Sequence, residues 1–318
     1  MRIFITGASG FVGGAAASHF AKTHDVVAMS RSEKSDATIK ALGITPIRCA
    51  LGAVTTEHLK DVDVIIHAAA KVEEWGPWAD YWKLNVDGTT QLLETAKAAG
   101  VKTFIHIGTE ASVFYGQSMR NIDETLPLAL RSPYPYSRTK AHAEQAVLAA
   151  NDENFRTISV RPRMIWGPGD KTILPVVLEM IEKGRFMWVD GGQALTSTTH
   201  IDNLVHGIDL AIARGKGGEA YFITDEGTRS LREFFTALTA TKGVTPPDKE
   251  MPGWLAGLLA RIIEGIWRGL SLKSTPPLTR FAADMMRREG TINIAKARAE
   301  LGYVPVISVK DGLAALSA

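Results

Sequence analysis

The sequence predicts an α/β protein with a doubly wound parallel sheet and a smaller, mostly helical C-terminal lobe. Three observations support this prediction: short apolar strands alternate with helix-forming segments up to Gly167, a glycine-rich turn joins the first strand to the first helix, and the alternation weakens beyond Gly167. Strands that alternate with helices are joined by crossover connections, which produce a parallel sheet covered by helices on both faces.

The elements follow one another in a regular order. A strand over 2–6 (RIFIT), a glycine turn running into a helix over 7–23, and a strand over 25–30 form a first βαβ unit. We then expect a strand over 44–51, a helix around 55–61, a strand over 62–70, a helix over 81–100, a strand over 102–108, a helix opened by 134–140 and a strand within 156–167. Strand-like segments return only briefly after that, at 220–225.

Gly7, Gly10 and Gly13 form a GxxGxxG set where the first strand meets the first helix. The first glycine permits a sharp turn, the second lets a pyrophosphate approach the backbone, and the third lets the helix pack on the sheet. A glycine turn without a ligand is the alternative. In this context the motif predicts a Rossmann-type dinucleotide-binding domain. We expect it to comprise residues 1–168 with 198–225 returning to it, and residues 169–197 and 226–318 to form a substrate-binding lobe.

The end of the second strand indicates which nucleotide is preferred. An acidic residue there would bind the ribose hydroxyls of NAD, but this chain has Ser30 followed by Arg31. A guanidinium can pair with a 2′-phosphate, so we expect NADP, with NAD possible as an alternative. Arg31 could instead be a surface residue that stacks on adenine.

Composition excludes several other classes of protein. The 318 residues carry 36 Lys and Arg against 34 Asp and Glu, without a block of like charges, which argues against a nucleic-acid partner. Cys49 is the single cysteine and the eight histidines show no metal-ligand spacing, so we expect no metal and a cytoplasmic location. The N-terminal strand is expected to be part of the fold rather than a signal peptide.

The stretch YPYSRTK contains a tyrosine and a lysine with catalytic spacing. Tyr136 and Lys140 are four residues apart, so they share one face of a helix for which Pro135 is a suitable start, whereas Tyr134 lies outside that row. A nearby ammonium group favours tyrosinate and so prepares the phenol for proton transfer. The alternative is a solvated helix face.

Taken together, these motifs resemble the extended short-chain dehydrogenase/reductase superfamily, also called the NAD(P)-dependent epimerase/dehydratase superfamily. The resemblance covers essentially the whole chain and is carried by the glycine turn, HAAA at 67–70, Asn85, GTEASVFYG at 108–116, the tyrosine–lysine pair and VRPRMIWGPGD at 160–170. Residues 69–111 and the tail from 276 to 313 are most similar to the bacterial 3β-hydroxysteroid dehydrogenase branch, which also contains 2-alkyl-3-oxoalkanoate reductases. The resemblance implies hydride transfer between a nicotinamide and a secondary alcohol or ketone.

It also implies roles for individual residues. Tyr136 would be the general acid or base, and Lys140 would lower the pKa of the phenol and bind the nicotinamide ribose. Thr109 would hydrogen-bond the reacting oxygen, with Ser112 as its rival. Asn85 would hold a water that relays protons, unless it is a helical asparagine without such a duty.

The resemblance implies cofactor contacts along the sheet edge. They are assigned to Gly7, Ser9, Gly10, Phe11, Val12, Gly13, Ser30, Arg31, Leu51, Ala68, Ala69, Ala70, Lys140 and Pro162. Ala50 occupies a position where relatives often carry an adenine-binding aspartate. We expect Arg161 and Asp202 to pair within the fold.

Aromatic residues indicate the class of substrate. Trp75, Trp78, Tyr81 and Trp82 lie between the fourth strand and its helix, where a large apolar substrate would be accommodated. We assign substrate contacts to Trp75, Trp78, Ser112 and Tyr134. The alternative is that these aromatic residues only pack the loop onto its own domain.

A second apolar run, residues 252–270, has the spacing of an amphipathic helix. Its large apolar residues recur at helical spacing, while Arg261, Glu264 and Arg268 fall on another face. Three charges argue against a spanning helix. We expect it to pack on the substrate lobe; roofing an apolar pocket or lying on a membrane surface are the alternatives.

The sequence therefore predicts an NADP-preferring oxidoreductase acting on an apolar, steroid-like or long-chain 3-oxo substrate. A sugar-nucleotide epimerase is the alternative, whereas a dehydratase would need a second acidic residue after Glu110, where Ala111 stands. A non-catalytic NADP-sensing regulator would not need the tyrosine–lysine pair. The resemblance also implies a homodimer.

Overall fold

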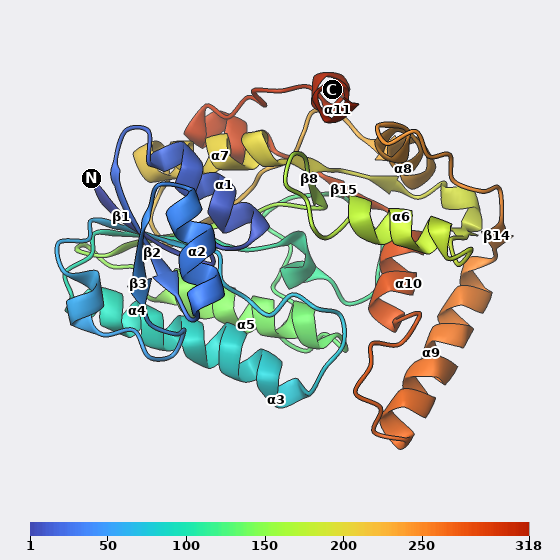
Figure 1. The fold of residues 1–318 in the computed structure, drawn as a ribbon, viewed down its shortest axis with the longest axis horizontal. Helices are drawn as coiled ribbons and strands as arrows, with labels where there is room; N and C mark the ends of the chain where they lie inside the picture. The colour runs from blue at the N-terminus through green and yellow to red at the C-terminus, as the bar shows by residue number, and fades with distance from the viewer. Residues whose placement is uncertain (318) are drawn as a thin grey trace.

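The computed structural model describes residues 1–317, and its main feature is one parallel sheet (Figure 1). Within these residues the sheet contains β12 (Glu219–Phe222), β7 (Arg156–Arg161), β5 (Thr103–Ile107), β4 (Val64–His67), β1 (Arg2–Thr6), β2 (Asp25–Ser30) and β3 (Thr45–Arg48), in that order. The chain runs outward from β1 to β3 and then outward from β4 to β12 in the other direction. Ligands of such sheets bind where the order reverses, which here is the edge at the ends of β1 and β4. The predicted doubly wound sheet is confirmed.

Helices cover both faces of this sheet (Figure 1). On one face lie α1 (Phe11–Phe20), α2 (Glu33–Ala41) and α7 (Ile201–Arg214); on the other lie α4 (Gly88–Ala98) and α5 (Pro135–Ala149). Successive side chains of a strand point to opposite faces. Accordingly, Ile3 and Ile5 of β1 belong to the core under α1 and α7, while Phe4 belongs to the core under α4.

Three predicted elements differ from the structure. Between β2 and β3 the chain forms α2, which the sequence analysis missed; it is capped by Ser32, whose hydroxyl accepts from the Ser35 amide, and it buries only one large apolar side chain, Ile39. The helix expected around 55–61 is a single 3-10 turn, η1 (Thr56–Leu59). The strand expected over 62–70 ends at His67, so the alanines after it are irregular backbone.

The helix expected over 81–100 is interrupted by a turn of π-helix. It consists of α3 (Trp78–Tyr81), the π-helical η2 (Trp82–Asp87) and α4. Such π turns are rare and occur frequently at functional sites. Asn85 lies within η2 and is buried.

The later part of the chain adds small sheets and helices. One sheet contains β13 (Arg229–Ser230), β10 (Leu195–Thr196), β15 (Gly290–Ile292) and β6 (Met119–Ile122), and two strand pairs are β8 (Ile165–Trp166) with β11 (Thr199–His200) and β9 (Trp188–Val189) with β14 (Glu250–Met251). The remaining helices are α6 (Leu174–Glu182), α8 (Leu231–Ala240), α9 (Gly253–Gly269), α10 (Arg280–Arg287) and α11 (Val309–Ser317), with the short turns η3 (Glu110–Val113), η4 (Asp190–Gly192) and η5 (Ala297–Leu301). Trp166, Trp188 and Phe234 form the core beneath α6 and α8.

Helix α9 does not pack as the sequence predicted. Its buried residues are the small Gly253, Ala256 and Ala260 together with Glu264, and the two alanines pack with Ala283 of α10. The expectation that its large apolar side chains pack on the lobe is wrong for the row Trp254, Leu258, Ile262, Ile266 and Leu270, which is exposed. Among residues 1–317 no helix is long and apolar enough to cross a membrane.

Candidate active site

The glycine turn lies at the edge where the strand order reverses. Gly7 has a positive φ of 75°, and a Cβ there would lie 2.9 Å from the backbone carbon of Ala68. A Cβ at Gly13 would lie 2.3 Å from the carbonyl oxygen of Gly7. Only glycine fits at both positions, because the turn passes so close to the loop after β4 and to the start of α1. The alanines after β4 are fixed there as well, since the Ala69 amide donates to Thr6 Oγ1 over 3.1 Å.

The first turn of α1 follows directly on this loop. Gly10 is the N-cap and supplies no capping side chain. The leading amides of a helix lack intrahelical acceptors, and together with the helix dipole they favour an anion such as a pyrophosphate. The residues present therefore fit the diphosphate of a nicotinamide dinucleotide.

Two guanidinium groups and one carboxylate lie near the end of β2. Arg31 is exposed, and Arg48 of β3 stands opposite Ser30 in the parallel register. Asp36 of α2 forms an ion pair with Arg48, and a hydrogen bond from the Ser30 side chain is the largest cause that lowers the pKa of Asp36. The sequence analysis missed Arg48, because only the pairing of β2 with β3 brings it beside Ser30.

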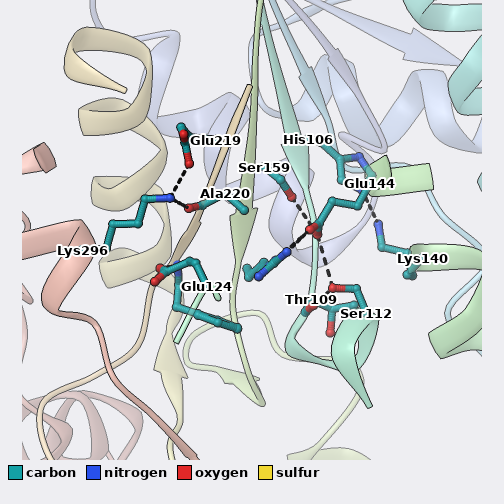
Figure 2. Close-up of polar contacts among 12 residues, drawn as sticks. His106, Thr109, Ser112, Glu124, Lys140, Glu144, Ser159, Glu219, Ala220 and Lys296 are labelled. Atoms are coloured by element: carbon teal, nitrogen blue, oxygen red, sulfur yellow. Dashed lines mark hydrogen bonds and ion pairs between the residues drawn. The ribbon is translucent and has the colours of Figure 1, made fainter. Parts of the chain in front are cut away.

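Tyr136 and Lys140 project from the first turns of α5, and Lys140 is almost fully buried. The Lys140 ammonium donates to the carbonyl oxygen of Ile107 over 2.7 Å. It also contacts Nε2 of His106 at 3.0 Å (Figure 2). Burial lowers the pKa of Lys140 to about 8, although the charge of Glu144 acts in the opposite direction. Burial also raises the pKa of Tyr136 above its ordinary value; the charge of Glu110 adds to this, and a hydrogen bond with Thr109 opposes it. The site thus keeps the phenol protonated and the amine close to its titration point.

His106 was not among the residues singled out from the sequence. It pairs in register with His67 of β4, and the two rings lie 5.6 Å apart. Burial, followed by the charge of Lys140, lowers the pKa of His67 to about 3 and holds the pKa of His106 well below its usual value. His106 is therefore neutral and accepts a hydrogen bond from Lys140. The sequence signal that could have identified His106 is the presence of a histidine in each of two apolar strands, VIIH and TFIHI.

A second polar network fixes the segment after β5. Thr109 donates to Oε2 of Glu110 over 2.8 Å, and Nη1 of Arg163 donates to Oε1 of the same carboxylate at 2.8 Å. The Glu110 amide donates to the carbonyl oxygen of Pro162, which brings the proline beside Thr109. Ser112 is fully buried and donates to the carbonyl oxygen of Thr109 over 2.8 Å.

Glu144 of α5 is the centre of a buried ion pair. Arg161 donates to Oε1 of Glu144 through Nε over 2.8 Å. Ser159 donates to Oε2 over 3.0 Å (Figure 2). The expected pairing of Arg161 with Asp202 is therefore wrong. Asp202 lies instead at the start of α7, 3.7 Å from Nδ1 of His200, because Arg161 points under α5 and away from α7.

Asn85 ties the loop after β4 to α5. Its Oδ1 accepts from the Lys71 amide over 2.7 Å, and its Nδ2 donates to the Lys71 carbonyl at 3.0 Å and to Thr139 Oγ1 at 3.1 Å. These bonds tie Asn85 to Thr139, the residue directly before Lys140. A proton-relaying water at Asn85 stays a prediction.

An aromatic cavity of about 730 Å³ opens beside Tyr136. Its wall includes four residues of the sequence analysis, Trp75, Trp78, Tyr134 and Tyr136, together with Trp267 and Phe281 from the C-terminal part of the chain. The Tyr134 hydroxyl donates to Asp284, and its ring stacks on Phe114. Ser112 is not part of this wall.

The fold, the glycine turn and the tyrosine–lysine pair define an oxidoreductase of the short-chain dehydrogenase/reductase class. The chain belongs to the NAD dependent epimerase/dehydratase family, which matches residues 3–224. The resemblance seen in the sequence is confirmed by relatives that bear reductase and 3β-hydroxysteroid dehydrogenase names.

Individual relatives cover nearly the whole chain. A 4-hydroxy-2-methyl-3-oxo-4-farnesyl-3,4-dihydroquinoline-1-oxide ketoreductase of Stigmatella aurantiaca is 40% identical over 99% of this chain and 96% of its own length. A 2-alkyl-3-oxoalkanoate reductase of Stenotrophomonas maltophilia is 34% identical over 100% of this chain and 99% of its own. Among solved structures, UDP-glucuronic acid 4-epimerase from Bacillus cereus in complex with NAD is 22% identical with a TM-score of 0.76, covering 98% of this chain and 96% of that chain, which supports the fold.

Proposed function

We propose that this protein is an NADPH-dependent ketoreductase of a large apolar substrate. The observation that carries the proposal is that Tyr136, a protonated phenol, stands in the wall of the aromatic cavity with Lys140 buried behind it. When bound, the nicotinamide supplies a hydride to the carbonyl carbon, and Tyr136 donates its proton to the carbonyl oxygen, so that a secondary alcohol forms. Oxidation of the alcohol uses the same groups in reverse.

Thr109, Tyr136 and Lys140 have separate roles around the reacting oxygen. Thr109 lies close enough to Tyr136 to influence its pKa, so a turn of its hydroxyl away from Glu110 would let both hydroxyls reach one carbonyl oxygen and stabilise its developing charge. The positive charge of Lys140 would stabilise the tyrosinate that forms when Tyr136 gives up its proton, and the ammonium would bind the nicotinamide ribose. The roles of Thr109, Tyr136, Lys140 and Asn85 and the cofactor and substrate contacts assigned from the sequence are parts of this proposal.

The lining of the cavity supports an apolar substrate. Trp75, Trp78, Trp267 and Phe281 all line the cavity and offer apolar surface that suits a fused-ring, alkyl or prenyl body. The names of the two relatives with 40% and 34% identity describe oxo compounds that carry a farnesyl or an alkyl group. Arg138, at 5.0 Å from the Trp78 ring centre, adds a cation that suits a polar or anionic end of the substrate.

The preference for NADP is the second part of the proposal. Arg31 and Arg48 are both exposed at the ends of β2 and β3, where a 2′-phosphate of the adenosine would lie. Residues 1–168 with 198–225 would bind the cofactor, and 169–197 with 226–318 would bind the substrate. A cytoplasmic location and a homodimer complete the proposal.

A nicotinamide absorbance assay tests this function. The purified chain is given NADPH or NADH with a 3-oxosteroid, a 2-alkyl-3-oxoalkanoate or a UDP-sugar. We expect oxidation of NADPH with an apolar ketone and a lower kcat/KM with NADH. Epimer formed from the UDP-sugar, without turnover of either ketone, would establish the epimerase alternative instead.

A further inference from the structure

Helix α9 exposes a continuous row of large apolar side chains. Trp254, Leu258, Ile262, Ile266 and Leu270 recur every four residues, with 69%, 47%, 50%, 47% and 66% of their surfaces exposed. Figure 1 shows α9 projecting at the lower right, away from the main sheet. Scattered exposed apolar residues are ordinary, but a contiguous row on one helix marks an interaction surface.

The fold does not use this row. The opposite face of α9 packs on α10 through Ala256 and Ala260 against Ala283, with Met286 and Val189 beside them. Small residues let the two helices approach closely, so the large ones are left on the outside. A helix that turned its large apolar side chains toward α10 and its alanines toward solvent would stabilise the lobe more, because burial of each large apolar side chain is favourable.

The exposed charges on α9 and on the segment that follows it have one sign. In the segment 252–279 the exposed charged residues are Arg261, Arg268 and Lys273. The one acid of the segment, Glu264, is 7% exposed and accepts from Nε of Arg280 at 2.9 Å. From α10, the Asp284 carboxylate is likewise paired with Arg287. The surface is therefore apolar with a cationic margin, the pattern of helices that lie at the interface of anionic bilayers.

We propose that the exposed face of α9 docks on an anionic membrane surface. A second copy of the chain fits this surface less well, because a two-fold contact along the row would bring Arg261 and Arg268 of each copy toward those of the other. The helix has 17 residues and three charged side chains, so it lies on the bilayer rather than across it.

Docking would also place the cavity beside the bilayer. Trp267, Arg268, Leu272 and Lys273, at the C-terminal end of α9 and just beyond it, belong to the wall of the cavity that contains Tyr136. An apolar ketone dissolved in the membrane could then reach the site without crossing water. This consequence rests on the proposed function, whereas the docking itself does not.

Flotation of the full chain with lipid vesicles tests the docking. Vesicles of phosphatidylcholine containing about one third phosphatidylglycerol are compared with phosphatidylcholine alone. The test variant is L258Q/I262Q, which changes two row residues outside the cavity wall. The matched control is V304Q/V306Q, whose side chains are 66% and 59% exposed elsewhere on the surface. Circular dichroism establishes that all three proteins are folded.

We expect the wild-type chain and the V304Q/V306Q control to float with the anionic vesicles, and the fraction of L258Q/I262Q that floats to fall at least about tenfold. High salt should weaken binding, because the cationic margin is exposed. A wild-type chain that stays below the vesicles, or an L258Q/I262Q variant that floats like wild type, would overturn the proposal. The proposal would also be overturned if the wild-type chain did not bind vesicles but formed a dimer that the L258Q/I262Q substitutions convert to a monomer. Flotation needs no turnover, so an inactive chain that floats would refute the proposed ketoreductase and leave the docking intact.

Discussion

Replacing Tyr136 by phenylalanine removes a single hydroxyl group from the site. The ring remains, and with it the edge-to-face contact with Phe281 at 6.0 Å and the packing of the cavity wall. Lys140 keeps both of its hydrogen-bond acceptors, since neither of them is Tyr136. Cofactor affinity should therefore change little, and the loss should fall on the proton-transfer step.

The size of the effect follows from the chemistry. A positioned general acid contributes about 100-fold to 10,000-fold to the rate, which corresponds to about 2.7–5.4 kcal/mol of activation free energy. We expect kcat of Tyr136→Phe to fall by that factor while the Kd for NADPH, measured by fluorescence titration, stays within about threefold. A KM effect alone would indicate a role in substrate binding only.

Tyr134 provides the matched control. It lines the same cavity two residues earlier, but its hydroxyl donates to Asp284, away from Thr109. Tyr134→Phe should therefore retain kcat within about tenfold. If Tyr136→Phe kept more than about a tenth of the wild-type kcat, or if both variants lost the same factor, Tyr136 would not be the specific proton donor.

Three further predictions concern the groups around the pair. His106→Leu removes an acceptor of the Lys140 ammonium, so the alkaline limb of the pH profile of kcat, expected near the Lys140 pKa of about 8, should move to lower pH. His106→Gln keeps an acceptor and should return the limb to its wild-type position. A limb that does not move in His106→Leu would contradict a role of His106 in setting the pKa of Lys140. Arg31→Ala should raise KM for NADPH about tenfold or more and leave KM for NADH nearly unchanged, whereas equal effects on both cofactors would argue against 2′-phosphate recognition. Glu144→Ala leaves the buried Arg161 without its partner and should lower the free energy of unfolding, measured by urea denaturation, by about 3–5 kcal/mol. An unchanged urea midpoint would contradict this prediction.

Local signals in the sequence accounted for the sheet and the reactive pair. Apolar strands such as RIFIT predict buried parallel strands, and the four-residue spacing of Tyr136 and Lys140 places both on one helix face. Helix α2 was missed because its one large buried apolar residue, Ile39, gives almost no periodic signal.

Residues that act through partners distant in the sequence could not be predicted. His106 faces Lys140, 34 residues later, only because β5 lies beneath α5, and Arg161 meets Glu144 for the same reason. The assumed partner of Arg161, Asp202, was chosen on charge alone, and charge does not specify which face of a strand a side chain occupies.

The amino-acid order by itself determined the fold class, the dinucleotide turn and the catalytic tyrosine candidate, because each depends on contacts within a few residues of the chain. Tertiary structure decided which face of α9 is covered. The sequence shows one amphipathic helix within 252–270, but close approach to α10 selected the alanines for burial and left the large apolar row exposed. The fold also brought Trp267 and Phe281 into one cavity wall with Trp75 and Trp78, so the cavity around Tyr136 exists only in the folded chain.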